Sequence, residues 1–541
     1  MKRRLYHLLM LLLLAACAGQ AQGQKNVLVY SAANRTHTDK SRILTLDLKK
    51  DFGAIGNGAA DDQPAFDAAA AFINARKGNC KLVIPQGTYR VGRQVANKEG
   101  RYMTGSNVMN IGGEDVGYQS NIEIAGAGQA ILKYKDNMQY GYFTMAGMPQ
   151  NIQAAKGVDV HKEAATLGKC INIFNCGNVR ISNLVLDGNF YPGKMKVGGR
   201  HLAASQGIQQ EHYGIFINYS ENVSISNVTA KRFGLDGFLI FNASTVKKNI
   251  RFDNCVADYN GRQGMSILFA DGVQVNNCKF TNTGMGELQY SGLQAGVDLE
   301  PEQSDYVIQN VTFNNCTFEN SRNTSVAVSS GAGKVRNISF TKCNIINVNT
   351  VGNSIALDIG RHKALQFTDC NIYGYVLIAQ SNAATASEGY SFKRCLFSDC
   401  YYGKSRQSLV PTSTILIYPP GGNQNWDYVT MDNCTFDVYT KRPWHYLKSA
   451  PGRMSRISNS IIYANGGKEI TGNDNTILQD DNISLENNTF YLRSESAYIH
   501  GGKTIAPANS TAEVKWNGNT IRRWGGRTPA RQCTAGTSRP R

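Results

Sequence analysis

Three carboxylates occupy every second position of the stretch AGVDLEPEQ, residues 295–303. They are Asp298, Glu300 and Glu302, and they alternate with two apolar residues and a proline. A period of two is that of a β-strand, whose successive side chains point to opposite faces. Carboxyl groups held this close cannot all ionise equally, so one can keep its proton while another stays charged. The stretch therefore predicts a strand that offers a proton donor and an ionised carboxylate on one face.

Elements that could position such a strand recur along the chain. Each is a short alternating run, then Asn or Asp, then a second short run, and most copies start about 23 to 29 residues apart. The copies include NVRISNLVLDGN (178–189), NIRFDNCVADYN (249–260), NVTFNNCTFENS (310–321) and ALQFTDCNIYGY (364–375). A unit this short cannot bury its own apolar face, so the units must stack. Three short strands per unit predict an all-β fold, a parallel β-helix of about a dozen coils. We expect its inward columns to hold Ile, Val, Phe, Leu, Cys and Asn.

Seven of the 13 cysteines fall at one position of this repeat. They are Cys255, Cys278, Cys316, Cys343, Cys370, Cys395 and Cys434. The sequence holds no Cys-x-x-Cys pair of the kind that binds zinc or does redox chemistry, so no metal site is predicted. We expect these cysteines to form a stacked column of buried thiols.

An exposed end of a stacked coil needs a cap. Residues 48–91 predict one, a helix with Asp62 as its N-cap and Pro64 in its first turn. The apolar face of this helix would consist of Ala65, Phe66, Ala69 and Phe72.

The same segment carries a family resemblance. DFGAIGNGAADDQPAF followed by VIPQGTYRV resembles the opening of the pectate-lyase-like superfamily, which includes polygalacturonase-related enzymes and phage tailspike depolymerases. The resemblance implies a right-handed, single-stranded parallel β-helix with an N-terminal capping helix and a polysaccharide ligand. It implies no single reaction, because the superfamily contains hydrolases, lyases, epimerases and pure binders. The polygalacturonase set of Asn-Thr-Asp, Asp-Asp, Gly-His-Gly and Arg-Ile-Lys motifs is not present as a set, which argues against a true polygalacturonase mechanism.

The strands that precede the repeated phrase can be aligned on one small residue each. These residues are Gly214, Gly237, Gly264, Gly296, Ser325 and Ser354. The first and third positions after each are always apolar and are expected to point inward, which sends the second and fourth outward. Asp298 then lies in the first outward column, and Glu300 and Asp358 lie in the second. Small residues surround them, so the three acids are predicted to share a groove floor.

The predicted spacing suits hydrolysis of a glycosidic bond. Residues two apart on a strand are separated by about 6.7 Å, and positions two strands apart by about 9.6 Å. Inverting glycosidases hold their carboxyl groups about 6.5–9.5 Å apart. Asp298, Glu300 and Asp358 are therefore the predicted catalytic residues, with Asp236 in reserve.

Polar side chains at the turns are predicted to bind substrate. Arg262 could pair with Asp298 or hold a sugar carboxylate in bidentate fashion. Glu302 follows a proline that is expected to end the strand, so it would contact substrate or an ion at the rim. The remaining candidates for substrate binding are His212, Gln263 and Arg361.

Insertions enlarge this face at residues 189–212 and 283–295, and loops of this kind often carry binding sites. A further insertion, 400–427, contains Tyr401, Tyr402, Tyr418 and Trp426. Those rings could stack on sugars or could pack in the interior.

Three functions fit these residues. The first is a glycoside hydrolase that needs no cofactor, and we favour it because acids outnumber plausible bases on the aligned face. The second is a polysaccharide lyase in which the acids hold Ca²⁺ against a uronate and an Arg, Lys or His removes the C5 proton. The third is a surface rod that binds glycans without catalysis.

The two ends predict export and a tail. Residues 1–23 read as a signal peptide, and Leu14-Ala15-Ala16-Cys17 resembles a lipobox in which Cys17 would be lipidated. Residues 24–44 would be a linker, 45–522 the β-helix, and 523–541 a basic disordered tail. The protein is expected to be periplasmic, at the cell surface or secreted.

The charge of the body indicates the class of partner. Of the formal charge of +17, three positive charges lie in the signal and six in the last twenty residues, so 17 − 3 − 6 leaves +8. A neutral or acidic polysaccharide is the expected partner, with no nucleic acid and with membrane contact only through a lipid anchor.

Overall fold

A computed structural model describes residues 42–523, with gaps at 97–102, 145, 153–163, 203–206, 243–248, 288–293, 330, 349–354, 402–414, 419–424, 439–441, 445–446, 465–479, 482, 493–497, 501–502 and 507–513. The chain forms two units, residues 1–39 and 40–541, and every described residue belongs to the second. The predicted signal peptide, Cys17, residues 24–41 of the predicted linker and residues 524–541 lie outside the described residues. Within the described part, no helix combines the length and apolar character needed to cross a bilayer.

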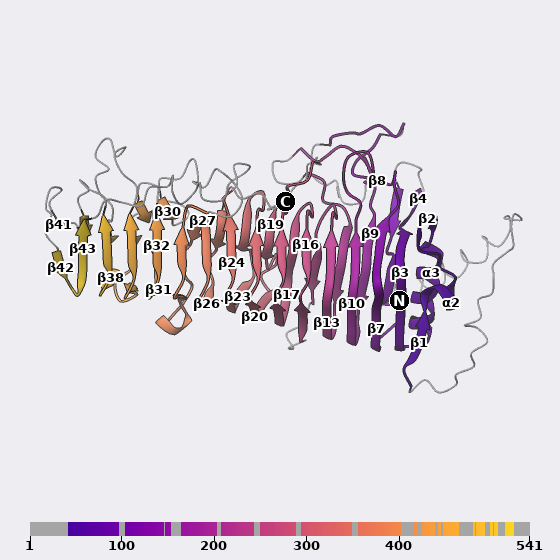
Figure 1. Ribbon diagram of the computed structural model, residues 1–541, viewed down its shortest axis with the longest axis horizontal. Coiled ribbons are helices and arrows are strands. Elements are labelled where there is room, and N and C mark those ends of the chain that lie inside the picture. Colours follow the sequence, from indigo (N-terminus) through magenta and orange to yellow (C-terminus); the bar gives the residue numbers. More distant parts are fainter. Residues whose placement is uncertain are drawn as a thin grey trace, which may run out of the picture. The chain divides into compact units, whose positions relative to one another are not determined.

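The described strands stack in three parallel ladders (Figure 1). The first ladder contains β6 (Met109–Gly112), β9 (Gly168–Phe174), β12 (His212–Asn218), β14 (Phe238–Phe241), β17 (Gln263–Asn276), β19 (Ala295–Leu299), β22 (Thr324–Val328), β25 (Ile355–Ile359), β27 (Asn371–Ile378), β30 (Ile415–Tyr418) and β33 (Arg442–Trp444). The second ladder contains β1 (Leu44–Asp47), β3 (Gly78–Val91), β7 (Gln119–Tyr134), β10 (Cys176–Asp187), β13 (Glu221–Lys231), β15 (Ile250–Asp253), β17, β20 (Val307–Asn314), β23 (Lys334–Thr341), β26 (Lys363–Thr368), β28 (Tyr390–Lys393), β31 (Val429–Asp432), β35 (Ser455–Ser458) and β38 (Ile483–Glu486). The third ladder contains the later parts of β3, β7, β10 and β13, and then β16 (Val256–Asp258), β18 (Lys279–Thr281), β21 (Thr317–Glu319), β24 (Asn344–Asn347), β27, β29 (Leu396–Ser398), β32 (Thr435–Val438), β36 (Ile461–Ala464), β39 (Thr489–Leu492) and β43 (Asn519–Arg523).

Shorter pairs decorate these ladders. They are β2 (Asn57–Asp61) on β3, β42 (Val514–Trp516) on β43, β4 (Arg93–Ala96) with β5 (Met103–Ser106), β8 (Gln139–Tyr140) with β11 (Lys196–Val197), β34 (Leu447–Lys448) with β37 (Asp480–Asp481), and β40 (Tyr498–His500) with β41 (Lys503–Ala506).

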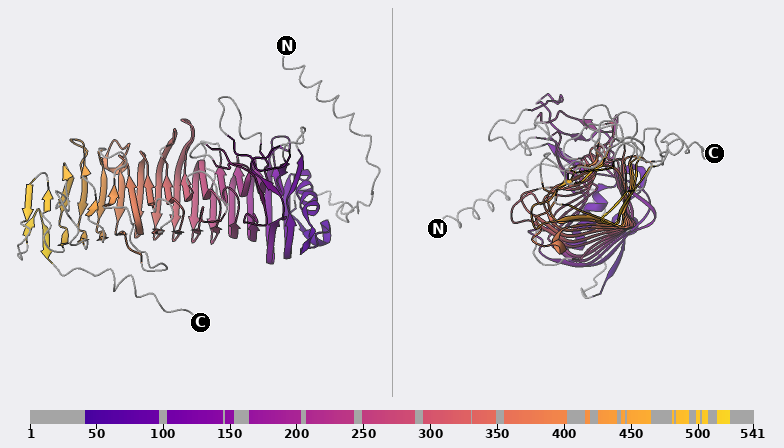
Figure 2. Two further views of the ribbon diagram at one scale, coloured as in Figure 1. Left: turned by 90° about the horizontal axis from the view of Figure 1, so that it is seen from above. Right: turned by 90° about the vertical axis from the view of Figure 1, so that its left-hand side faces the viewer.

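Each strand of a ladder pairs with a strand one repeat further along the chain. Val311 of β20 pairs with Ile338 of β23, and Ile338 pairs with Leu365 of β26. The chain therefore returns to the same side once per repeat, and the end-on view shows the strands around a common interior (Figure 2). The predicted all-β parallel β-helix is confirmed.

Equivalent side chains of successive repeats stack inside the coil. The rings of Phe313, Phe340, Phe367 and Phe392 form one such column, with centroids 4.7, 4.8 and 4.7 Å apart and almost parallel planes. This spacing matches the distance of about 4.8 Å between neighbouring strands. An apolar residue at one position of the repeat is thus buried against its own counterpart.

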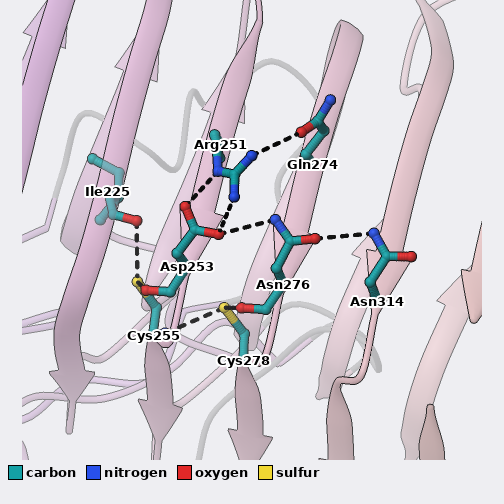
Figure 3. A network of polar contacts seen from close by, with 8 residues as sticks. All are labelled: Ile225, Arg251, Asp253, Cys255, Gln274, Asn276, Cys278 and Asn314. Carbon is teal, nitrogen blue, oxygen red and sulfur yellow. Dashed lines mark hydrogen bonds and ion pairs between the residues drawn. The ribbon is translucent and has the colours of Figure 1, made fainter. Parts of the chain in front are cut away.

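The repeat cysteines form a second interior column, as predicted. All seven are buried and carry free thiols. The backbone N–H of Cys255 donates to the sulfur of Cys278 at 3.2 Å, and the Cys255 thiol donates to the carbonyl of Ile225 at 3.6 Å (Figure 3). The column is part of the core and its thiols satisfy backbone groups.

The asparagines of the repeat divide between the interior and the corners of the coil. Asn189, Asn260 and Asn347 are fully buried, as predicted for inward asparagine. Asn178, Asn222, Asn249 and Asn310 occupy corners of the coil with φ of 53 to 56°. Asparagine tolerates this left-handed conformation better than most residues. All four of these side chains are exposed. The prediction of inward asparagine is wrong at these corners because backbone conformation, rather than burial, selects the residue there.

Two helices accompany the first strands, α2 (Leu48–Phe52) and α3 (Gln63–Ala75). Ala65, Phe66 and Ala69 of α3 are fully or nearly fully buried, while Phe72 is half-buried. Asp62 stands at the N-cap position, but its carboxylate accepts from the N–H groups of Ile55 and Gly56 rather than from the helix.

The aromatic residues of the 400–427 insertion are only partly described. Trp426 is buried and its indole N–H donates to the carbonyl of Ile378 at 3.1 Å. The ring of Tyr401 contacts that of Tyr373, with centroids 4.9 Å apart. Tyr402 and the side chain of Tyr418 lie outside the described part. Trp426 thus packs in the interior and offers no ring to a sugar.

Candidate functional site

The acidic strand β19 lies in the middle of the first ladder. Ser266 of β17 pairs with Asp298, and Asp298 pairs with Ala327 of β22. Val297 and Leu299 on either side are fully buried in the core. The predicted alignment on Gly214, Gly237, Gly264, Gly296 and Ser325 is confirmed by the observed register.

The predicted position of Asp358 is wrong by two residues. Ala327 pairs with Asp358, so Asp358 continues the column of Asp298 and not the column of Glu300. Its side chain still points to the outer face and is half-buried. Asp298 and Asp358 therefore lie two strands apart in one column, with backbones separated by about 9.6 Å. Burial raises the pKa of Asp358 to about 6.

Asp298 is fully buried beneath this face. Its Oδ1 accepts from the Ser329 hydroxyl at 2.7 Å, and its Oδ2 accepts from the side-chain amide of Gln263 at 2.9 Å. Burial, followed by the charge of Glu300, holds the pKa of Asp298 well above its usual range. The Ser329 hydrogen bond and Arg262 act in the opposite direction but do not prevail. Asp298 is therefore a carboxyl that binds its proton more tightly than a free aspartate does.

Glu300 is half-buried and sits next to Asp298 on the outer face. Burial and the charges of Glu302 and Asp236 raise its pKa, while Arg262 and a hydrogen bond with Asp298 lower it. Asp298 and Glu300 are thus neighbouring carboxyl groups that both bind a proton more tightly than usual. Glu302, beyond the strand, is exposed.

Asp236 and Arg262 form a two-point ion pair. Arg262 Nε lies 2.8 Å from Asp236 Oδ1, and Nη2 lies 2.5 Å from Oδ2. The Asp236 side chain is fully buried, and only 16% of the Arg262 side chain is exposed. The suggested pairing of Arg262 with Asp298 is replaced by this bidentate contact. Both oxygens of Asp236 are thus occupied, which leaves it no part as the reserve catalyst.

The buried side chain of Gln263 links Asp298 to the backbone of its own strand β19. Its amide N–H donates to Asp298, and its carbonyl oxygen accepts from the backbone N–H of Ala295 at 2.7 Å. The side chain is buried, so Gln263 holds the carboxyl of Asp298 in place and is not a surface contact for substrate.

His212 lies in the interior and not on the outer face. Its ring is fully buried among the rings of Tyr134, Tyr140, Phe190 and Phe233. Its Nδ1 accepts from the backbone N–H of Gly234 at 2.9 Å, and burial lowers its pKa to about 3. The prediction that His212 binds substrate is not supported, because no part of the neutral ring reaches solvent.

Arg361 and His362 follow Asp358 along the chain. Arg361 is exposed, and its guanidinium makes no ion pair with a described residue. His362 is buried, and its Nε2 lies 2.8 Å from the carbonyl oxygen of Ser329, the residue whose hydroxyl bonds Asp298. Arg361 thus remains a candidate contact for an anionic substrate.

Two tyrosines near the acids had escaped the sequence argument. Tyr213 is half-buried, and burial together with Asp236, Glu211 and Glu302 raises its pKa against the effect of Arg262. It directly precedes the aligned Gly214, so the same alignment would have placed it beside Asp236 and Gln263.

The second of these is Tyr306. Its ring stacks on Phe269 with centroids 5.1 Å apart and leans on Phe241 at 5.4 Å. Its pKa is raised by burial and then by Asp305 and Glu302, so this aromatic cluster borders the acidic rim. The sequence hinted at it through Phe241 in the second outward column, but a register shift in β17 places Phe269 rather than Leu268 opposite Phe241.

Within the described residues, no three His, Cys, Asp or Glu side chains are grouped so as to hold a metal ion.

Comparison with known proteins defines the class. Residues 49–286 match the family model described as "Rhamnogalacturonase A/epimerase, pectate lyase-like". The N-terminal fragment of bacteriophage Phi29 gene product 12 has a similar fold, with a TM-score of 0.52, 14% identity, and coverage of 89% of this chain and 71% of that one. The fold is therefore that of a parallel β-helix. Residues 49–286 are thus similar to the pectate-lyase-like superfamily.

Curated relatives are distant and much longer. A mannuronan C5-epimerase of Azotobacter vinelandii, AlgE3, is 28% identical over 255 residues, 44% of this chain and 12% of the relative. Alginate lyase 7 of the same organism is 26% identical over 236 residues, 40% of this chain and 23% of the relative. The chain thus matches less than a quarter of the length of each. The family match ends at residue 286, before the acidic strand, so it assigns no role to Asp298 or Glu300.

Proposed function

We propose that the protein acts on a polysaccharide that lies along the outer face of the first ladder, and that it is a glycoside hydrolase. One observation carries the proposal. Asp298, Glu300 and Asp358 share this face, and burial is the first cause of the raised pKa of each, while neighbouring acids raise the pKa of Asp298 and Glu300 further. Unequal carboxyl groups at one site are what acid and base catalysis of glycoside cleavage requires.

The environments suggest a division of roles. Asp298 is covered, whereas Glu300 and Asp358 are half-buried and can be reached by a substrate. Glu300, whose pKa is raised by burial and then by the charge of Glu302, is suited to be the general acid that protonates the leaving oxygen. Asp358 is ionised above a pH of about 6 and is suited to be the base that activates water. Asp298 and Gln263 would then be positioning residues.

The spacing is compatible with these roles. Glu300 is displaced from Asp358 by two residues along the strand and by two strands, so their backbones lie about 12 Å apart. The side chains can shorten this gap toward the separation of about 6.5–9.5 Å that leaves room for water in inverting enzymes. The rings of Tyr306 and Phe241, beside the acidic rim, would stack on a neighbouring sugar.

A second candidate is chemistry at C5 of a uronate, either elimination or epimerisation. The observation that favours it is the similarity to mannuronan C5-epimerases and an alginate lyase. The sequence suggested that the acids hold Ca²⁺ against the uronate carboxylate, but no three acids of the described residues are grouped to do so. Of the bases that the sequence suggested, Arg262 is ion-paired with Asp236 and His212 is buried. Arg361 is exposed and is therefore the remaining candidate for the base.

The products distinguish the candidates. Purified protein is incubated with neutral and acidic polysaccharides, with and without EDTA, and reducing ends and the ultraviolet absorbance of unsaturated uronates are followed. We expect new reducing ends without that absorbance, unaffected by EDTA. Unsaturated ends lost with EDTA would refute the hydrolase and support the lyase. A change in uronate configuration without cleavage, read by NMR, would support the epimerase. Binding with no product on any polymer would support the non-catalytic glycan-binding rod.

A further inference from the structure

A second groove runs over the outer side of the second ladder. It has a volume of about 900 Å³ and is lined by residues of β7, β10, β13, β15, β17, β20 and β23. None of the acids of the candidate site lines it. The groove is therefore separate from the site on the first ladder.

The floor of this groove is one column of polar side chains. Strand pairing places Glu123, Arg180, Ser224, Arg251, Gln274 and Thr312 next to one another on successive strands. Five steps of about 4.8 Å make this floor about 24 Å long. All six side chains are half-buried or exposed. The floor thus offers hydroxyl, amide and charged groups to a ligand that follows the axis of stacking.

One wall of the groove is a ladder of corner asparagines. The side-chain N–H of Asn178 donates to Asn121 at 3.1 Å, that of Asn249 to Asn222 at 3.1 Å, and that of Asn337 to Asn310 at 3.4 Å. A carboxamide has two N–H donors, so each of these three donors keeps one N–H for another partner. The regular spacing of these groups suits the hydroxyls of an extended chain of sugars.

The charges of the floor are not equivalent. Glu123 is paired with Lys81 at 2.8 Å, and Arg251 is held by both oxygens of Asp253 at 2.5 and 2.9 Å, with Gln274 at 3.4 Å (Figure 3). Arg180, between them on β10, is exposed and makes no ion pair with a described residue. A guanidinium that has no ion-pair partner can bind a carboxylate or sulfate in bidentate fashion.

We propose that this groove is a second glycan-binding site that holds a strand of an acidic polysaccharide, with one carboxylate on Arg180 and hydroxyl groups on the asparagine ladder. The site needs no catalysis and would keep a long polymer on the protein while another part of it lies on the first ladder. Charge complementarity at Arg180 selects an anionic over a neutral chain.

Binding of polygalacturonate to the full-length Glu300→Gln protein tests this by calorimetry, with neutral dextran as the reference polymer. Arg180→Glu reverses the open charge, and Ser224→Trp fills the groove without changing charge. Each should weaken polygalacturonate binding about tenfold. Arg456→Glu is the control for position, because Arg456 is an exposed arginine of the same ladder beyond the groove, paired with Glu486 at 3.3 Å. Its affinity should stay within about twofold of the parent protein.

Two results would overturn the proposal. One is unchanged affinity in both Arg180→Glu and Ser224→Trp, with an unchanged melting temperature as proof of folding. The other is an equal loss in Arg456→Glu, which would mean nonspecific attraction to a basic surface. Neither result depends on turnover, so a failure of the hydrolase proposal is seen separately in the product assay.

Discussion

The hydroxyl of Ser329 donates to Oδ1 of Asp298 at 2.7 Å, from a residue that directly follows the neighbouring strand β22. On the other side, Gln263 of β17 donates to Oδ2. The carboxyl is thus fixed between two turns of the coil, and burial raises its pKa. A structure made only of stacked strands in this way fixes a titrating group more rigidly than a surface loop would.

The first prediction concerns stability and pH in Asp298→Asn. The pKa of Asp298 is raised in the folded state, so its stabilising contribution is complete below the ordinary pKa of an aspartate and falls as pH rises toward the folded pKa. Asparagine does not titrate. The free energy of unfolding of the wild type, relative to Asp298→Asn, should therefore decrease from pH 4 to pH 7. A difference that is constant, or that grows with pH, would show that Asp298 is ionised in the fold.

The second prediction concerns the pH dependence of activity. Asp358 has a pKa of about 6, so a role as base requires kcat/KM to rise with pH through about 6. Asp358→Asn should lose this limb together with about 10²–10⁴-fold in rate. A profile that falls through the same pH range would make Asp358 the acid instead, and an unaltered profile in Asp358→Asn would remove it from the mechanism.

The third prediction concerns the buried ion pair. Arg262→Ala leaves the charge of Asp236 buried without its partner, which should cost about 3–5 kcal/mol in unfolding free energy. The double variant Asp236→Asn, Arg262→Met removes both charges and should recover most of that loss. Chemical denaturation of Asp236→Asn, of Arg262→Met and of the double variant gives the coupling between the sites. Equal stability of Arg262→Ala and the wild type would contradict a structural role for the pair.

The fourth prediction concerns the corner asparagines. Asn277 has a φ of 54° and is exposed, and its carbonyl oxygen accepts from Asn315 at 2.8 Å. Valine in the left-handed region should cost about 1–2 kcal/mol, whereas glycine adopts that φ without strain. Asn277→Val should therefore melt well below Asn277→Gly. If the two variants melt together, side-chain bonding rather than backbone conformation selects the asparagine.

The fold could be read from the sequence because the repeat encodes it locally. Alternating apolar residues fix which side chains point inward, and five strands of the first ladder aligned correctly on one small residue each. The sixth failed for a physical reason. Ile355, Leu357 and Ile359 are all apolar, so a shift of two residues keeps the inward pattern, and period two cannot tell the two registers apart.

The candidate site was only partly predictable. Outward direction in a strand does not imply exposure, since Asp298 points outward by register and is nevertheless fully covered. His212 was assigned to the outer face although the chain turns just before it, and its ring enters the aromatic interior. Arg262 can reach acids on either neighbouring strand, and its rotamer decides which one it pairs with. Aligning the strands by sequence does not give that rotamer. The sequence therefore did not predict how deeply a side chain near a turn is buried or which residue it pairs with.

The central claim is that Glu300 and Asp358 carry the chemistry on the first ladder. The rate at which Glu300→Gln releases reducing ends from a polysaccharide that the wild type cleaves tests it most directly, with Asp305→Asn as the control because Asp305 is an exposed acid just beyond the same rim. We predict a loss of about 10²–10⁴-fold in Glu300→Gln and nearly full activity in Asp305→Asn, with equal melting temperatures. Wild-type activity in Glu300→Gln would contradict the account.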